Sequence, residues 1–360
     1  METDFAKVKR DAFEDSFSDI AVSICVINYN GMKYLKDTFD AIFSIDCRKF
    51  DVMLIDNAST DESVGFVEAN YGDVQIVNMP ENRGPNIARN YALKNATNDY
   101  VFLLDNDAIL TKDCLDKLIK GLSSDSAAVT CSPLIVDADK AEIVQYGATH
   151  IHYVGAAIID RHFEYSTQNT NGNYISTTIN GTALLVNRAR VNNIALFDED
   201  MFFGWTDGDF SYRLTSSGNH CLIDRNAIVR HPKSNRSKKV IYHQVKNRWV
   251  FMLKNYSLKT LIITAPALIF YELCLLGFIV MSGGLGSFFK ALADVIKEWP
   301  VILQKRKEAM INKTRPDREL LRAGDFLSSQ LILKNKYIRL ATGLINFILD
   351  KYWVLVKRMV

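Results

Sequence analysis

Short apolar runs that alternate with amphipathic stretches, from about residue 21 onward, constrain the fold of this chain most strongly. The apolar runs predict buried strands, and the stretches between them have the spacing and the N-capping residues of helices. Strands and helices in this order predict a parallel sheet with helices on its faces. Three strands end in a polar residue, and such ends lie at one edge of a parallel sheet, where they can form a single cleft. These residues are Asn28, Asp56 and Asp105.

The tripeptide Asp105-Asn106-Asp107 directly follows the apolar run at residues 100–104. Side chains alternate along a strand, so both carboxylates are expected on one face at the carboxyl end of this strand. Paired carboxylates there suit Mg2+ or Mn2+ shared with a substrate diphosphate, because Mg2+ binds few protein carboxylates and completes its shell with phosphate oxygens and water. Asp-x-Asp is also common in solvated loops, so the neighbouring motifs have to decide between these two interpretations.

Composition limits the classes of protein to which the chain can belong. With 360 residues, 48% of them hydrophobic, it can bury one large core or a domain with an appendage. A formal net charge of +2 gives no reason to expect a nucleic-acid partner. The 6 cysteines are scattered without a C-x-x-C pair, which favours a reduced, cytosolic setting. Residues 1–20 are polar and lack the features of a secretory signal. They are expected to form a polar N-terminal leader that precedes the first domain.

Between about residues 125 and 225 the alternation of strands and helices becomes less regular. Strand-like pieces, the longest of them at 175–186, are separated by polar loops that contain glycine. Loops often carry binding functions, so we expect the substrate-specific surface here. The alternate spacing of His150 and His152 imitates a pair of metal ligands, but no third ligand is evident, and they are predicted to be surface residues of a strand.

Residues 261–281 are almost wholly apolar and long enough to cross a bilayer. Pro266 and Glu272 interrupt this stretch, and cations are abundant on both of its sides, at 233–259 and 290–318. A single crossing would place one basic flank on the wrong side of the membrane, so a re-entrant hairpin or an in-plane helix on the cytosolic leaflet is favoured. The alternative is a buried core helix of a soluble protein.

The polar ends of the strands belong to a longer series of short motifs. In their order and spacing these motifs resemble the family 2 glycosyltransferases with the GT-A fold, particularly the rhamnosyltransferase-like branch, over residues 21–255. Each motif is weak by itself, whereas the series is specific. The motifs are Val26-Ile27-Asn28-Tyr29-Asn30, Leu54-Ile55-Asp56-Asn57-Ala58-Ser59-Thr60-Asp61, Glu81-Asn82-Arg83-Gly84, Asp105-Asn106-Asp107, Asn180-Gly181-Thr182-Ala183-Leu184-Leu185-Val186, Phe197-Asp198-Glu199, Thr206-Asp207-Gly208-Asp209 and His231.

The resemblance implies an α/β protein with a GT-A domain at 21–255, built on a Rossmann-like, mostly parallel sheet flanked by helices. The apolar stretch and its basic flanks predict a helical, membrane-associated tail at 256–360. It implies an inverting, metal-dependent transfer of a single sugar from a nucleotide-diphosphate sugar to a hydroxyl of a glycan or lipid-linked acceptor, in surface polysaccharide or glycoconjugate synthesis. Mg2+ or Mn2+ is the implied cofactor, and the expected location is the cytoplasmic face of the cell membrane. The alternative is a non-catalytic, membrane-associated protein that binds a sugar nucleotide or a glycan.

Three residues match the metal positions of the family. Asp107 matches the metal-binding carboxylate, and Asp105 matches the position that contacts the ribose or helps to hold the metal. His231 matches the histidine that completes the metal shell or touches the diphosphate. Without the resemblance, a lone histidine is more often structural.

Other matched residues are expected to surround the nucleotide sugar. Asp56 matches the residue that hydrogen-bonds the nucleobase, although an aspartate at this place can also cap a helix. Asn28 and Tyr29 match positions that line the base, and Asn106 is assigned to the same site from its place between the two carboxylates. Arg83 stands where the family often has a cation near the nucleotide, and a solvated loop arginine is the alternative.

The general base is expected in Thr206-Asp207-Gly208-Asp209. The family usually has Glu-Asp here, so Asp207 matches the second carboxylate and is the predicted base, while Thr206 replaces the glutamate. Asp209 is the competitor, but residues two apart on a helix point in different directions, and only one of them readily faces the sugar. Asp209 is expected to pair with Arg213 instead.

The segment Gln244-Val245-Lys246-Asn247-Arg248-Trp249 resembles the Gln-x-x-Arg-Trp motif of processive polysaccharide synthases, but its gap is three residues rather than two. We see only one apolar stretch where those synthases have several spans, and a single-addition enzyme is predicted. The basic residues around the segment are expected to dock anionic lipid or acceptor pyrophosphate, or else to form a solvated helix face. No G-x-G-x-x-G follows the first strand, and G-x-x-x-x-G-K is absent, which argues against a Rossmann dehydrogenase and a P-loop kinase.

Overall fold

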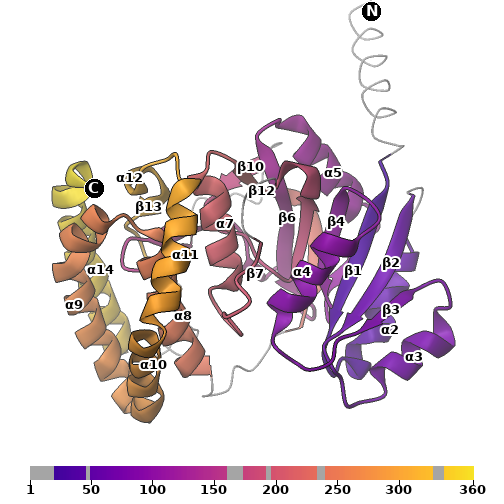
Figure 1. The fold of residues 1–360 in the computed structure, drawn as a ribbon, viewed down its shortest axis with the longest axis horizontal. Coiled ribbons are helices and arrows are strands. Elements are labelled where there is room, and N and C mark those ends of the chain that lie inside the picture. Colours follow the sequence, from indigo (N-terminus) through magenta and orange to yellow (C-terminus); the bar gives the residue numbers. More distant parts are fainter. Residues whose placement is uncertain (1–19, 46–48, 160–172, 192–195, 233–239, 327–335) are drawn as a thin grey trace, which may run out of the picture.

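The computed structural model describes residues 20–45, 49–159, 173–191, 196–232, 240–326 and 336–360. A large sheet with helices on both faces occupies one part of the molecule, and helices from the C-terminal third stand beside it (Figure 1). The predicted leader lies outside the described residues except for Ile20, and so do four cations of the basic segment before residue 260, namely Lys233, Arg236, Lys238 and Lys239.

The main sheet contains ten strands within the described residues: β1 (Val22–Asn28), β2 (Phe50–Asp56), β3 (Gln75–Asn78), β4 (Tyr100–Asp105), β5 (Ile109–Leu110), β6 (Ala128–Asp137), β7 (Val144–Tyr146), β10 (Asn173–Ser176), β11 (Ala183–Asn187) and β12 (His220–His231). Its main path runs β10-β12-β6-β11-β4-β1-β2-β3, with β5 beside β12 and β7 beside β6. The first four strands are parallel, as predicted, and their register places Asn28 beside Asp56 and Ile27 beside Asp105. β11 is antiparallel to both of its neighbours, so the sheet is mixed.

Side-chain alternation gives the sheet two apolar faces. Along β1, Ile24 and Val26 pack into one layer, and Cys25 and Ile27 pack into the other. Because both faces are covered, every residue of β1 is buried. The first face is covered by α2 (Met32–Phe43), α3 (Ser63–Asn70) and α5 (Cys114–Ser124), and the second by α4 (Pro85–Asn95) and α7 (Thr206–Ser216).

The strand predicted at 175–186 is wrong as a single element, because it is split into β10 and β11. The cause is a turn in the intervening residues. The side-chain oxygen of Asn180 accepts a hydrogen bond from the backbone N–H of Thr182 at 2.7 Å, which bends the chain before β11 begins. This turn brings Gly181 to the edge of the sheet where the polar strand ends lie.

A second, smaller sheet joins the C-terminal region to the rest of the molecule. It consists of β13 (Leu321–Arg322), β8 (Thr149–His152) and β9 (Ala156–Ile159), with β13 parallel to β8. One apolar core includes Ile151 and Tyr212 together with Phe251 and Trp353, so packing is continuous across residue 255, and the domain boundary predicted there stays a prediction. The helices of this region are α8 (Val240–Asn255), α9 (Leu258–Met281), α10 (Leu285–Lys297), α11 (Trp299–Ile311), α12 (Asp317–Leu320) and α14 (Lys336–Val356).

The two histidines of β8 lie in a strand, as predicted, but the prediction that they are surface residues is wrong. His150 is 2% exposed and His152 is fully buried. The C-terminal region covers them: Arg322 contacts Nε2 of His150 at 2.9 Å, and Phe326 packs on the ring of His152. Burial lowers the pKa of His152 to about 3, so this ring is neutral at physiological pH.

Candidate active site

The polar residues at the ends of β1 and β2 are joined by hydrogen bonds. The side-chain amide of Asn28 donates to Asp56 Oδ1 at 2.7 Å and to Ser63 Oγ at 2.9 Å, and Asn106 donates to Asn28 Oδ1 at 2.7 Å. The second oxygen of Asp56 accepts from the backbone N–H of Ser59 at 2.8 Å. Asn28 and Asp56 are both buried, so they form the base of this edge and hold Asn106 above it.

This edge depends on a close approach of the backbone at Gly31. A Cβ atom there would lie 2.1 Å from Nδ2 of Asn106 and 2.4 Å from Oδ1 of Asn28, so only glycine fits. The neighbouring Tyr29 is about half exposed and is available to a ligand at the edge. Arg83 is also exposed, and its contact with Glu81 is long, at 3.7 Å, so it is not drawn into the edge.

The last residue of β12, His231, lies beside the carboxylate expected to bind metal. Nε2 of His231 is 3.4 Å from Oδ1 of Asp107, and Nδ1 is 3.1 Å from the side-chain oxygen of Gln145. When Nδ1 donates to Gln145, the lone pair of Nε2 faces Asp107, which is the orientation of a histidine ligand held by an outer-shell partner. Within the described residues no three Asp, Glu, His or Cys side chains form a metal cluster, so diphosphate oxygens and water would have to complete the shell.

Asp105 is held by a cation that sequence reasoning missed. Arg89, on α4, donates to Asp105 Oδ1 at 3.1 Å and to the carbonyl oxygen of Gly181 at 2.9 Å, and its side chain is 6% exposed. Burial raises the pKa of Asp105 to about 6; Arg89 opposes this rise, and Asp107 adds to it. A Cβ atom on Gly181 would lie 2.8 Å from the guanidinium, so glycine is required at the turn. Arg89 is therefore the cation that lies beside Asp105, while the place of Arg83 near the nucleotide stays a prediction.

The buried face of α4 also fixes the segment that leads to α7. Asn86 donates to the carbonyl oxygen of Asp198 at 2.7 Å. Asn90 donates to the carbonyl oxygen of Phe197 at 2.9 Å and accepts from its N–H at 3.0 Å. Asn86, Arg89 and Asn90 lie three and four residues apart, so they share one helix face. The sequence offered one signal for this role of α4: three polar residues spaced so that they share the inward face of a helix.

For the sugar transfer that the resemblance implies, Arg89→Met is expected to lower the catalytic efficiency roughly 10- to 100-fold, the usual cost of losing an outer-shell partner. The reason is that Asp105 and Gly181 would lose their common donor. Initial rates with a matched donor and acceptor measure the effect, and Arg89→Lys should restore part of the rate. Arg318→Met, at an exposed position of α12, is the matched control. An equal loss in Arg318→Met and Arg89→Met would contradict the role of Arg89.

Asp207 lies in the first turn of α7, as the helical pattern predicted. Two residues with positive φ, Gly204 at +75° and Trp205 at +63°, precede α7 and set the direction of its first turn. The carboxylate accepts one hydrogen bond from the N–H of Gly208, at 3.0 Å, and one from the N–H of Gly181, at 3.1 Å, and it stays partly exposed. The peptide groups of Gly181 thus contact Asp207 through the N–H and Arg89 through the carbonyl, which joins Asp207 to the Asp105 edge.

Asp209 has no comparable access to a substrate. It is fully buried, and its oxygens accept from Arg213 at 3.0 Å, from Lys254 at 2.7 Å and from Asn255 at 2.7 Å. The pairing predicted between Asp209 and Arg213 is confirmed. Its lone pairs are engaged by these donors, so Asp209 is structural and Asp207 remains the candidate base.

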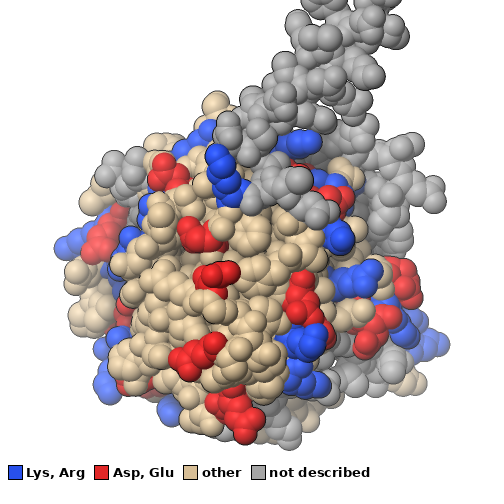
Figure 2. Space-filling view, turned by 90° about the vertical axis from the view of Figure 1, so that its right-hand side faces the viewer, with Lys and Arg blue, Asp and Glu red and all other residues tan. Residues whose placement is uncertain are grey.

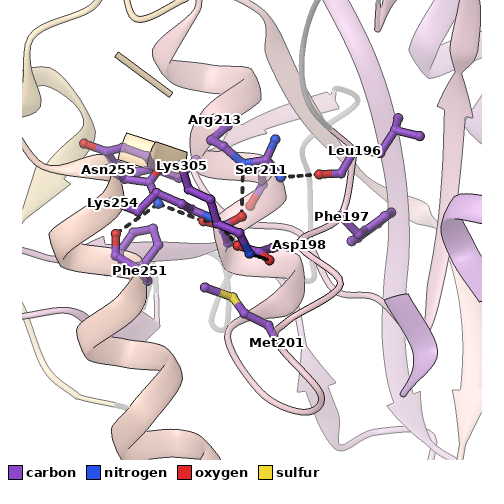
Figure 3. A network of polar contacts seen from close by, with 12 residues as sticks. Leu196, Phe197, Asp198, Met201, Ser211, Arg213, Phe251, Lys254, Asn255 and Lys305 are labelled. Carbon is purple, nitrogen blue, oxygen red and sulfur yellow. Dashed lines mark hydrogen bonds and ion pairs between the residues drawn. The ribbon is translucent and has the colours of Figure 1, made fainter. Parts of the chain in front are cut away.

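Lys254 connects this pair to the C-terminal helices (Figure 3). Its Nζ lies 2.6 Å from Oδ2 of Asp198, while Lys305, on α11, contacts the other oxygen of Asp198 and reaches Asp200 at 2.6 Å. Burial alone would raise the pKa of Asp198, but Lys254 and Lys305 outweigh burial and hold this pKa below its usual range. The segment between Phe197 and α7 is therefore fixed by α4 from one side and by α8 and α11 from the other.

The cations of α8 are engaged by acids of the protein, so for them docking of lipid or pyrophosphate and a solvated face are both wrong. For the cations at 233–239, outside the described residues, the prediction stays open. Lys246 pairs with Glu298 at 2.7 Å, and Arg248 is buried against Glu272 while donating to the carbonyl oxygen of Val154 at 3.0 Å. Glu272, which interrupts the apolar stretch of α9, is therefore the partner of an internal cation. These pairs connect α8 to α9 and to the residue that follows α10.

The strand order of the main sheet and its polar edge define the fold class of the protein, which solved structures share. The solved structure of GalNAc-T7 with UDP, GalNAc and Mn2+ is similar, with a TM-score of 0.57 and 16% identity over 69% of this chain and 51% of that chain. S. aureus TarS in complex with UDP-GlcNAc is similar with a TM-score of 0.53 and 16% identity, over 81% of this chain and 89% of that chain. The predicted GT-A fold is confirmed.

The match to a sequence family covers a shorter part of the chain than the match to the solved structures. Residues 23–192, just under half of the chain, match the model of Glycosyl transferase family 2. The putative teichuronic acid biosynthesis glycosyltransferase TuaG of Bacillus subtilis (strain 168) is 30% identical over 110 residues, 30% of this chain and 44% of the relative. These matches support family 2 for a segment that includes Asp105 and Asp107. Asp207 and His231 lie beyond it, and the match spans less than half the length of that relative.

Proposed function

We propose that this protein transfers a single sugar from a nucleotide-diphosphate sugar to a hydroxyl of a glycan or lipid-linked acceptor, with inversion at the anomeric carbon. The observation that carries the proposal is the single turn at Gly181. Its N–H binds Asp207, and its carbonyl binds Arg89, which holds Asp105. A base and a donor-side carboxylate on opposite sides of one fixed peptide suit a displacement in which one group receives a proton and the other supports the leaving group.

On the donor side, Asp107 and His231, with Asp105 beside them, would hold Mg2+ or Mn2+. The separation of Asp107 and His231 and the orientation of the imidazole fit such an ion. When bound, it neutralises negative charge on the departing diphosphate. Tyr29 and the edge formed by Asn28, Asp56 and Asn106 would receive the nucleotide.

On the acceptor side, the hydroxyl oxygen forms a bond to the anomeric carbon as the bond from that carbon to the diphosphate breaks. The electron pair of the broken bond leaves with the diphosphate, and the hydroxyl proton passes to the carboxylate of Asp207. The N–H groups of Gly181 and Gly208 keep this carboxylate oriented before the reaction, which lowers the cost of reaching the reactive geometry.

The relatives support the finer parts of the proposal. Solved neighbours hold UDP-GlcNAc in one case and UDP with Mn2+ in another, which supports a nucleotide-sugar donor and a divalent cation. The name of TuaG supports an acceptor in the synthesis of a surface polysaccharide. We further propose a place in the rhamnosyltransferase-like branch, on the strength of the motif series, and membrane association of the C-terminal region at the cytoplasmic face.

Thermal unfolding with a panel of nucleotide sugars, with and without Mn2+, tests the donor side. A donor present at about 100 times its Kd should stabilise the fold by roughly 2.7 kcal/mol. Asp107→Asn is expected to abolish the part of this stabilisation that requires Mn2+, because the ion loses its carboxylate. Asp73→Asn, at an exposed turn, is the control and should keep it. An Mn2+-dependent shift of normal size in Asp107→Asn would contradict the metal assignment.

A turnover assay distinguishes the proposed enzyme from the non-catalytic alternative. A glycan-binding or nucleotide-binding protein would show the same thermal shift but would not release nucleotide diphosphate when the acceptor is added. A donor-dependent shift without any transfer, across lipid-linked and soluble acceptors, would favour this alternative over the enzyme.

A further inference from the structure

The outer side of α9 carries a continuous apolar stripe. Its members are each at least 53% exposed, and they recur at intervals of four and seven residues, so they lie along one face of the helix. They are Leu258, Ile262, Ile269, Leu273 and Val280. Soluble surfaces rarely show long rows of exposed large apolar side chains, and such rows mark sites of interaction with a protein or a membrane.

The C-terminal helix α14 continues this apolar surface. Tyr337, Leu340, Leu344, Phe347 and Val354 are each at least 58% exposed and follow a spacing of three, four and seven residues. The two helices lie side by side at the left of Figure 1. The hydroxyl of Tyr352 on α14 donates to the carbonyl oxygen of Ile263 on α9 at 2.6 Å, which fixes them against each other. We call the two stripes together the α9–α14 surface.

The inner side of α9 packs against the rest of the protein. At its start, Asp317 accepts hydrogen bonds from the N–H of Ser257 at 2.7 Å and from the hydroxyl of Thr260 at 2.6 Å. In its middle, Glu272 pairs with the buried Arg248. In the described part of the chain, α9 is the one helix long and apolar enough to cross a membrane. A helix with an ion pair and a packed core on one side cannot be surrounded by lipid, so only its outer stripe can enter a bilayer.

The charges around the surface identify its partner. The residues of α9, of α14 and of the short C-terminal 357–360 segment include one acid other than the paired Glu272, the partly buried Asp350. Their exposed cations are Lys259, Lys336, Arg339, Lys351, Lys357 and Arg358. A second copy of the chain, packed face to face, would bring these like charges together. The far end of the molecule, by contrast, exposes acidic and basic side chains interspersed (Figure 2).

We propose that the α9–α14 surface seats this protein on an anionic lipid bilayer, with both helices in the plane of the membrane and their apolar stripes in the headgroup and acyl boundary. Exposed apolar stripes flanked by lysine and arginine are the features by which in-plane helices bind negatively charged lipid. This inference rests on the proposed function for its biological sense, since an acceptor linked to lipid would be presented at the same membrane. It assigns to α14 a role that the predicted span at 261–281 did not include.

Flotation of the full chain with vesicles tests the proposal. Vesicles of phosphatidylcholine mixed with phosphatidylglycerol should bind the protein, whereas high salt or phosphatidylcholine alone should weaken binding. The double variant Ile269→Glu with Leu344→Glu, one substitution in each stripe, should weaken binding at least about tenfold, because two apolar side chains leave the lipid and two acids are added. The matched control is Val301→Glu with Ile311→Glu, two exposed apolar residues of α11, and it should bind like the wild type.

Three results would overturn the proposal: equal vesicle binding by the stripe variant and the wild type, equal binding to both vesicle compositions, and a dimer in sedimentation that the stripe variant abolishes while neither vesicle binds. The donor-dependent thermal shift is measured on the same samples. If the shift fails while vesicle binding holds, the proposed function is wrong and the membrane surface stands. If the shift holds in both double variants while vesicle binding does not follow the stripes, only the membrane surface is wrong.

Discussion

Asp207→Asn is expected to lower the rate of sugar transfer roughly 10²- to 10⁴-fold, the range found when a positioned general base is lost. An amide keeps the shape of the side chain and can still accept the hydrogen bond from Gly181, so the turn should stay in place. It cannot take up the proton of the acceptor hydroxyl. Single-turnover rates with saturating donor and acceptor report this step, and the donor-dependent thermal shift should be close to that of the wild type.

Asp209→Asn provides the matched comparison, because it is the same substitution two residues away. Asp209 is buried among Arg213, Lys254 and Asn255, so its loss should appear mainly as a lower unfolding temperature. A rate that collapses in Asp209→Asn at full stability, with Asp207→Asn unaffected, would exchange the roles of the two aspartates.

Lys254→Met is expected to destabilise the fold by about 3–5 kcal/mol, the cost of removing one partner from a buried ion pair. Lys254 is 3% exposed and lies between two buried carboxylates, at 2.6 Å from Asp198 and 2.7 Å from Asp209. Methionine fills a similar volume but leaves negative charge that Lys305 and Arg213 balance only in part. Chemical denaturation measures the loss, and transfer activity should fall with it because the segment before α7 is held by the same charges.

Lys246→Met is the control for Lys254→Met, since it removes a lysine of the same helix. Its partner Glu298 is 37% exposed, and a pair open to water contributes only about 0–1 kcal/mol. Equal losses of stability in the two variants would mean that burial does not set the strength of the Lys254 network.

The parts of the site that follow local pattern could be predicted from the sequence. The ends of β1, β2 and β4 follow from apolar runs and their parallel order, which brings Asn28, Asp56 and Asp105 to one edge. The pair of Asp209 and Arg213 follows from helical spacing alone. In each case the signal lies within a few residues, and the fold adds only the register that joins one strand to the next.

The parts that were wrong or missed depend on partners far away in the chain. His150 and His152 are buried by Arg322 and Phe326, and the contact between His150 and Arg322 spans 172 positions. Nothing in the sequence around β8 indicates such a cover. Arg89 was overlooked for a similar reason, because its acceptors at Asp105 and Gly181 come together only once β4 and the turn before β11 are in place.

The charges on α8 show a different limit of prediction from composition. A run rich in lysine and arginine has the same appearance whether it faces solvent or acids of another helix. The acids that pair with Lys246 and Arg248 belong to the C-terminal region, with Glu298 directly after α10 and Glu272 on α9, and they are recognised only when these elements pack against α8. Among the exposed cations, Lys336, Arg339 and Lys351 lie on α14, where a few basic residues among large apolar ones attract little notice in a sequence.

The contact of Lys305 with Asp198 and the pairing of β13 with β8 have a consequence for how such proteins diversify. A C-terminal region that supplies a strand and a half-buried cation to the N-terminal part of the chain cannot be exchanged by recombination with the tail of a homologue unless both parts change together. Gene fusion at the end of α8 would deprive Asp198 of Lys305 and β8 of its partner β13. Adaptation of the proposed membrane surface to other lipids is therefore expected to proceed by point substitutions on the outer faces of α9 and α14, while their inner faces change slowly in step with α7 and α8.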